Sequence, residues 1–109
     1  MKKSFVVLAV LIAIIALWPI PKLYAADGKE LYQTNNCVMC HGADGKGNPM
    51  MAQMFNVDGG ALNLTVTAKK RNDQELSGVI KDGKGKMPPF KNISPAELKA
   101  LVQYLRSLK

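Results

Sequence analysis

The sequence contains few of the residues that bind metals or cross-link small domains. Its 109 residues include one histidine and two cysteines. A zinc site made of cysteine and histidine needs four such ligands, and a disulfide framework needs several cysteine pairs. The sequence therefore excludes both kinds of site, together with any site that needs two histidines.

Aromatic residues and strand-like patterns are also scarce. Phe, Trp and Tyr make up 6% of the chain. The alternation of apolar and polar residues that is typical of a half-buried strand is almost absent, and no internal repeat is found. Because 109 residues allow only one domain, these patterns favour a single all-α domain.

The first 25 residues differ in composition from the rest of the chain. Two lysines precede an apolar run over residues 5–18, and small residues follow at Ala25 and Ala26. This order is typical of a secretory signal peptide, and the run is shorter than the ~20 residues that cross a membrane. If the cut follows Ala25, Leu23 is the third residue before it, where a signal peptidase needs a small residue, so an uncleaved N-terminal anchor stays an alternative. Both interpretations place residues 26–109 outside the cytoplasm, in the periplasm or an equivalent compartment.

Removing this leader lowers the positive charge of the chain. The formal net charge is +7, and three lysines lie in residues 1–25, which leaves +4 for the remainder. An excess of this size is weak support for nucleic-acid binding, which usually requires a strongly basic domain. We therefore expect no nucleic-acid partner.

Three segments of the domain carry helix signals. Each begins with a capping residue, Asp27, Asn72 or Ser94, and has an acidic residue three positions later, as in a capping box. The first helix is expected to run toward residues 35–36, and the second to stop at Gly83. The third is expected to continue almost to the end of the chain, with its apolar residues on one stripe.

Two long stretches between these helices are rich in glycine, asparagine, proline and methionine, residues 42–68 and 84–93. A 27-residue loop without secondary structure is unusual in so small a domain. The sequence therefore predicts that something other than the polypeptide organises the first stretch.

The two cysteines and the histidine lie together, in the segment Cys37-Val38-Met39-Cys40-His41, which we expect at the end of the first helix. At this spacing two thiols can add to the vinyl groups of one haem while the neighbouring imidazole reaches the iron. A thioredoxin-like dithiol is the competing interpretation, but it requires a strand-helix-strand context. A disulfide across so short a loop would stabilise little. The pattern therefore favours covalently bound haem.

With one histidine in the chain, methionine is the natural second axial ligand. The domain contains five methionines, Met39, Met50, Met51, Met54 and Met87. Met39 lies inside the attachment loop, on the wrong face of the ring. The proline after Met87 stiffens its loop and favours Met87. Met50, Met51 and Met54 stay as alternatives, although a methionine usually fills a core.

In chain order, the motifs of residues 26–109 resemble those of class I c-type cytochromes. They are Gly28-x-x-Leu31-Tyr32, Cys37-x-x-Cys40-His41-Gly42, Asp44-Gly45-x-Gly47, Gly83-x-Gly85-x-Met87-Pro88 and Glu97-Leu98…Leu101…Tyr104-Leu105. The resemblance implies a monohaem domain, an all-helical wrap around one covalently bound haem. It also implies that the first and last helices cross where Gly28 and Tyr32 meet Tyr104.

The same resemblance implies the residues of the haem site. Cys37 and Cys40 would form the thioethers, and His41 and Met87 would be the axial ligands. Residues of the haem pocket would be Leu64, Pro88 and Phe90. One departure is that many members have a proline shortly before the leucine corresponding to Leu64, where this chain has Ala61-Leu62-Asn63. The carbonyl that orients His41 is thus unassigned, with Pro49 as one candidate.

An iron with both axial positions filled by protein can change oxidation state but has no free position for a substrate. The expected function is therefore a one-electron carrier between redox partners, not an enzyme, working as a monomer or as a subunit of a redox complex. Alternatives are a haem ligand sensor or peroxidase-like enzyme with a labile Met87, and a thiol oxidoreductase that uses Cys37 and Cys40. Basic residues of the loops could form a rim that steers acidic partners, namely Lys46, Lys69, Lys70, Arg71, Lys84, Lys86 and Lys91.

Overall fold

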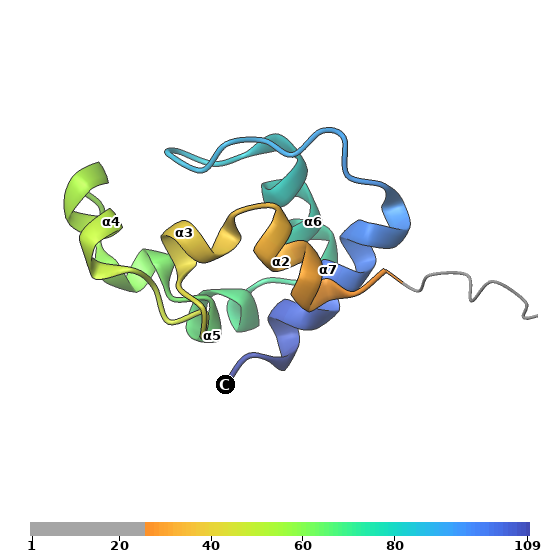
Figure 1. Cartoon of the computed structure of the whole chain (residues 1–109), viewed down its shortest axis with the longest axis horizontal. Helices are drawn as coiled ribbons and strands as arrows, with labels where there is room; N and C mark the ends of the chain where they lie inside the picture. The colour runs from red at the N-terminus through yellow and green to blue at the C-terminus, as the bar shows by residue number, and fades with distance from the viewer. Residues whose placement is uncertain (1–25) are drawn as a thin grey trace, which may run out of the picture.

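The computed structural model describes residues 26–109, so the predicted signal peptide or anchor lies outside the described residues. Within residues 26–109 the regular secondary structure is helical and contains no strand, which confirms the predicted all-α fold (Figure 1). The elements are α2 (Gly28–Thr34), α3 (Cys37–His41), α4 (Pro49–Phe55), η1 (Gly59–Leu62), α5 (Leu64–Thr67), η2 (Ala68–Lys70), α6 (Asp73–Asp82) and α7 (Pro95–Ser107).

The first and last of these helices cross each other, as the sequence predicts (Figure 1). At the crossing, a Cβ atom on Gly28 would lie 2.2 Å from the Ala100 carbonyl oxygen and 2.7 Å from the Tyr104 Cβ. The ring centroids of Tyr32 and Tyr104 are 5.3 Å apart at an interplanar angle of 59°, an edge-inclined geometry that aromatic pairs favour. Glycine at position 28 is therefore what lets the two helix backbones touch.

Helices α6 and α7 begin at the predicted caps. The Asn72 side chain accepts a hydrogen bond from the Glu75 backbone N–H at 2.8 Å. Ser94 and Glu97 form a complete capping box, with the Ser94 hydroxyl accepting from the Glu97 N–H and the Glu97 carboxylate accepting from the Ser94 N–H. These bonds satisfy N–H groups that a helix start otherwise leaves unpaired.

The hydrophobic core lies among α2, α6 and α7, and Tyr32 and Leu101 are its largest fully buried side chains. Arg106 of α7 fastens this core to the segment before α6. Its guanidinium donates to the carbonyl oxygens of Ala68 and Arg71 at 3.0 and 2.6 Å, and to the Asp73 carboxylate at 2.6 Å. A planar fork of donors can reach three acceptors at once.

The expectation that residues 42–68 form a loop between helices is wrong, because α4, η1, α5 and the start of η2 lie within them. The first three of these begin with a side-chain cap, Asn48, Asp58 and Asn63. Pro49 also stands at the first position of α4, where proline is favoured. These helices have at most seven residues and no sustained apolar stripe, so the periodicity that marks longer helices is missing.

The Cys-x-x-Cys-His segment is also placed differently from the prediction. It forms its own short helix, α3, instead of the end of the first one. Asn36 separates α2 from α3 with left-handed backbone angles, φ 60° and ψ 23°. Asparagine is one of the few residues other than glycine that adopts this conformation readily.

Candidate haem-binding site

Helix α3 brings the two cysteines and the histidine to one side of the chain. Cys37 and His41 are four residues apart and Cys40 is three residues from Cys37, so all three share one helix face. Both cysteines are free thiols and are half-buried. The arrangement leaves two sulfur atoms and an imidazole available to the same ligand.

Burial raises the pKa of the Cys37 thiol to about 11. A catalytic dithiol needs the opposite shift, because the thiolate is the attacking form and a reactive cysteine has a lowered pKa. A thioether carries no charge and is not penalised by the same burial. The environment of Cys37 thus argues against a thiol oxidoreductase and suits a covalently attached cofactor.

The imidazole of His41 is oriented by a backbone carbonyl. Its Nδ1 lies 2.8 Å from the carbonyl oxygen of Leu62. Because a carbonyl oxygen can only accept, Nδ1 must carry the proton in this bond, which leaves the lone pair on Nε2. Burial lowers the pKa of His41 and so favours this neutral form, which is the form that binds metals.

Leu62 thereby supplies the carbonyl that the sequence left unassigned, and the Pro49 candidate is wrong. Pro49 is the exposed first residue of α4, whereas Leu62 ends η1. One sequence signal marked this segment as a turn. Leu62 follows Asp58-Gly59-Gly60, and an aspartate followed by two glycines is typical of a tight turn. The pairing itself joins residues 21 positions apart, which no local pattern reveals.

The loop that carries Met87 is folded back on the end of α6. The backbone groups of Lys84 and Met87 exchange two hydrogen bonds, at 2.9 and 3.1 Å, and the Phe90 N–H donates to the Ile80 carbonyl oxygen at 3.0 Å. Gly83 starts the loop with φ 76° and ψ 169°, a region that essentially only glycine occupies. Met87 is half-buried and packs against the core.

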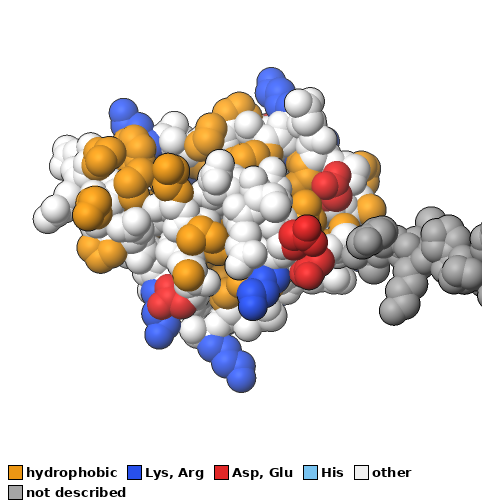
Figure 2. Space-filling model, in the orientation of Figure 1, with side chains coloured by type: hydrophobic (Ala, Val, Ile, Leu, Met, Phe, Trp, Pro, Cys, Tyr) orange, Lys and Arg blue, Asp and Glu red, His pale blue; other side chains and the backbone are white. Residues whose placement is uncertain are grey.

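The remaining methionines are placed less favourably. Met39, Met50 and Met54 are 60%, 69% and 67% exposed, and Met51 is half-buried in α4. Figure 2 shows hydrophobic side chains gathered on the side of the molecule where α4 lies in Figure 1. Among the methionines of residues 26–109, Met87 is therefore the one outside α4 that is partly shielded from solvent.

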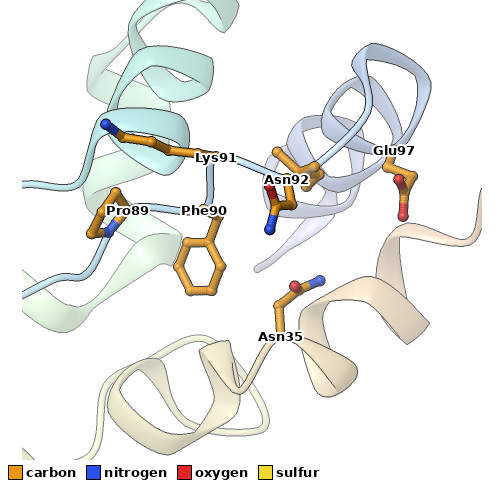
Figure 3. Close-up of a pocket in the computed structure, with 7 residues that line it drawn as sticks. Asn35, Pro89, Phe90, Lys91, Asn92 and Glu97 are labelled. Atoms are coloured by element: carbon orange, nitrogen blue, oxygen red, sulfur yellow. The ribbon is translucent and has the colours of Figure 1, made fainter.

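A pocket of about 290 Å³ adjoins the loop after Met87 (Figure 3). It lies between the end of α2 and the start of α7, where the Phe90 ring points toward Asn35. Its lining residues are Asn35, Pro89, Phe90, Lys91, Asn92, Ile93 and Glu97. None of the three motif residues lines it, so this pocket neighbours the candidate site without forming it.

The residues predicted for the pocket around the haem are only partly buried. Leu64 and Phe90 pack against the protein core, and the Leu64 N–H donates to the Gly45 carbonyl oxygen at 2.7 Å. Pro88 is exposed. Their role at the haem stays a prediction.

The donors present fit a covalently bound haem. Two free thiols, a neutral imidazole with a free Nε2 and a half-buried thioether together provide both attachment points and both kinds of axial donor. Within residues 26–109 no three histidine, cysteine, aspartate or glutamate side chains gather as a metal site. In the same part of the chain, no helix has the length and apolar character that a bilayer crossing requires.

The fold and the donors define a small all-α haem-binding domain. A family model described as cytochrome c matches residues 25–109, and the chain belongs to the cytochrome c family. As a member of that family the protein carries covalently bound haem c, and Cys37, Cys40 and His41 fit the attachment motif. The resemblance drawn from the sequence is confirmed.

Curated relatives include subunits of larger proteins and a small cytochrome. The chain is 38% identical over 88 residues to the Cbb3-type cytochrome c oxidase subunit CcoP of Helicobacter pylori, covering 75% of this chain and 27% of that subunit. It is 29% identical over 90 residues to cytochrome c oxidase subunit 2 of Alkalihalophilus pseudofirmus, covering 78% and 26%. Cytochrome c-551 of Bacillus subtilis is 38% identical over 64 residues, covering 59% and 46%. The chain thus spans about a quarter of the length of the two oxidase subunits.

Proposed function

We propose that this haem c electron carrier is exported and works with iron ligated by His41 and Met87. The observation that carries the proposal is the hydrogen bond between His41 Nδ1 and the Leu62 carbonyl oxygen, which directs Nε2 away as a free donor. Met87 supports it, because its loop is held by backbone bonds and its side chain is partly shielded.

When bound, the haem supplies a one-electron Fe(III)/Fe(II) couple. The residues of this chain would hold the haem rigidly and leave no free position on the iron for a substrate. Cys37 and Cys40 would tether the ring, and the Leu62 carbonyl would keep the His41 imidazole in one tautomer and one orientation. A thioether from Met87 is a weak donor and would raise the reduction potential relative to a second imidazole.

Filling both axial positions is the reason to propose a carrier without enzymatic activity. A labile Met87 would open the iron, as a sensor or peroxidase requires. The two hydrogen bonds between Lys84 and Met87 oppose such movement. Rapid carbon monoxide binding to the reduced wild-type protein would contradict the proposal.

The axial ligand can be tested optically. The far-red absorption band of the oxidised protein reports methionine on the iron, and we expect it to disappear in Met87→Ala. Met51→Ala is the matched control, since Met51 is also half-buried but lies in α4, and its spectrum should be unchanged. Loss of the band in Met51→Ala with retention in Met87→Ala would overturn the assignment.

The partners are proposed to be acidic redox proteins. Six lysines of the predicted rim are exposed and Arg71 is partly exposed. Relatives named as oxidase subunits suggest that the domain could serve within, or deliver electrons to, a respiratory complex. Steering by charge predicts transfer rates that fall with ionic strength, and rates insensitive to salt in stopped-flow measurements would remove this part of the proposal.

Export and the state of the leader have a separate test. We expect the protein in the extracytoplasmic fraction, with residues 1–25 removed. Mass analysis of the N-terminus distinguishes a cleaved leader from a retained anchor, and recovery of the holoprotein from the cytoplasm would contradict export.

A further inference from the structure

The loop that follows His41 packs directly on the segment that supplies the Leu62 carbonyl. The Gly47 N–H donates to the His41 carbonyl oxygen at 2.7 Å, and the Leu64 N–H donates to the Gly45 carbonyl oxygen at 2.7 Å. These two bonds fix the loop to His41 on one side and, on the other, to the first residue of α5, two positions after Leu62.

Gly47 lies against η1. A Cβ atom built there would be 3.2 Å from the Leu62 Cβ, 3.3 Å from the Gly59 carbonyl oxygen and 3.4 Å from the Leu62 carbonyl carbon. The first two distances are tighter than most real Cβ contacts, so η1 would have to give by a few tenths of an ångström to admit a side chain. Gly47 also has a φ of 99°, which strains every residue except glycine.

Such a side chain would press on the Cβ atom of Leu62, the same residue whose carbonyl orients the imidazole. The Leu62 carbonyl carbon carries the oxygen that accepts from His41 Nδ1 at 2.8 Å. A hydrogen bond weakens steeply when its length or angle departs from the optimum. We propose that Gly47 is a positioning residue for His41, because its missing side chain lets the Leu62 carbonyl reach the ring.

This inference rests on the proposed ligation of the iron by His41. A hydrogen bond from Nδ1–H to a carbonyl makes the other ring nitrogen a better donor. A better donor favours Fe(III), so the bond lowers the reduction potential, which is one of the protein's means of tuning a haem. Weakening the bond is expected to shift the potential in the positive direction.

The test uses the haem-loaded variant Gly47→Ala. We expect a positive shift of its midpoint potential and a changed NMR chemical shift of the His41 Nδ1–H proton. Gly45→Ala is the matched control, because Gly45 lies in the same loop with a φ of 77°. Its Cβ would meet the Leu108 Cδ1 at 2.6 Å, which is the movable end of a side chain and not part of η1. Gly45→Ala should lower stability while leaving both readouts near their wild-type values.

Removal of the contact from the other side gives a second variant. Leu62→Gly keeps the carbonyl but deletes the Cβ that lies nearest to position 47. The double variant Gly47→Ala/Leu62→Gly should therefore move both readouts back toward those of Leu62→Gly alone. If Gly47→Ala yields no holoprotein, recovery of holoprotein in the double variant supports the proposal, and failure to recover it overturns the proposal.

Failure of this inference and failure of the proposed ligation give different results. If the wild-type NMR spectrum lacks His41 ring protons shifted by the haem, the ligation by His41 is wrong. If those protons are shifted but Gly47→Ala changes neither readout, or changes them no more than Gly45→Ala does, only the role of Gly47 is wrong.

Discussion

The region of α2, α6 and α7 is packed by its own side chains, whereas the region between His41 and Leu64 is not. Nearly all buried hydrophobic residues belong to α2, η2, α6, α7 and the residue that follows α7. Within residues 42–63 only Gly45 and Ala52 are buried. The second region is held instead by turns, helix caps and backbone hydrogen bonds. The difference teaches that the larger region has a core of its own, whereas the smaller region between His41 and Leu64 has almost none, and we propose that the haem supplies the apolar surface that it lacks.

The largest expected effect is loss of the haem. In the double variant Cys37→Ser/Cys40→Ser we expect most of an unfolding free energy on the order of 5 kcal/mol to be lost, because so small a domain has little core of its own. Amide hydrogen exchange should show the least protection over residues 42–63. If the variant melts cooperatively from a helix-rich state with residues 42–63 protected, the second region does not depend on the haem for its structure.

The crossing of α2 and α7 tests the packed region. In Gly28→Ala the new Cβ would overlap backbone atoms of α7, so we expect a loss of about 3 kcal/mol in chemical denaturation. Gly78→Ala is the control: no atom lies within 4 Å of its Cβ position in α6, and alanine there should stabilise by up to about 1 kcal/mol. Equal effects of the two substitutions would mean that the crossing is not tightly packed.

Gly83 tests the Met87 loop, which leaves the packed region at the end of α6. In Gly83→Ala a Cβ would lie 2.7 Å from the Met87 carbonyl oxygen, and the backbone angles disfavour alanine by about 2 kcal/mol. We expect a weakened or missing far-red band as the loop moves. Gly85→Ala, with a φ of 57° and open space around it, should cost about 1 kcal/mol and keep the band. A normal band in Gly83→Ala would show that the loop does not need this glycine.

The smallest expected effect concerns the start of α7. Hydrogen bonds from Ser94 lower the pKa of Glu97 below its ordinary value. The ionised Glu97 carboxylate therefore stabilises the folded state fully above the ordinary glutamate pKa. This stabilisation is lost as the pH falls through the lowered pKa of Glu97 in the folded state. Melting temperatures measured from about pH 6 to about pH 3 should fall less in Glu97→Gln than in the wild type.

Glu75→Gln is the matched control for this last prediction. Glu75 stands at the same position of α6, but its carboxylate accepts from the Asn72 side chain instead of the cap backbone. Glu75→Gln should change the acid dependence of the melting temperature less than Glu97→Gln does. The reverse order would contradict the importance of the α7 capping box.

The longer helices and the attachment motif could be predicted because their determinants are local. The caps Asn72 and Ser94 act on residues three positions away, and the three motif residues lie within five positions of one another. The helices of residues 42–68 were missed, although Asn48, Asp58 and Asn63 cap them, because they are too short to show an apolar period.

By itself the sequence determined that this chain forms an all-α domain of the cytochrome c type with haem attached at Cys37-x-x-Cys40-His41. Only the tertiary structure decided which carbonyl orients the histidine, and that Gly47 lies against Leu62. The physical reason is that a helix cap is satisfied within one turn of the chain. The contact between His41 and Leu62 instead requires two distant segments to meet, at a place where a glycine allows their backbones to touch.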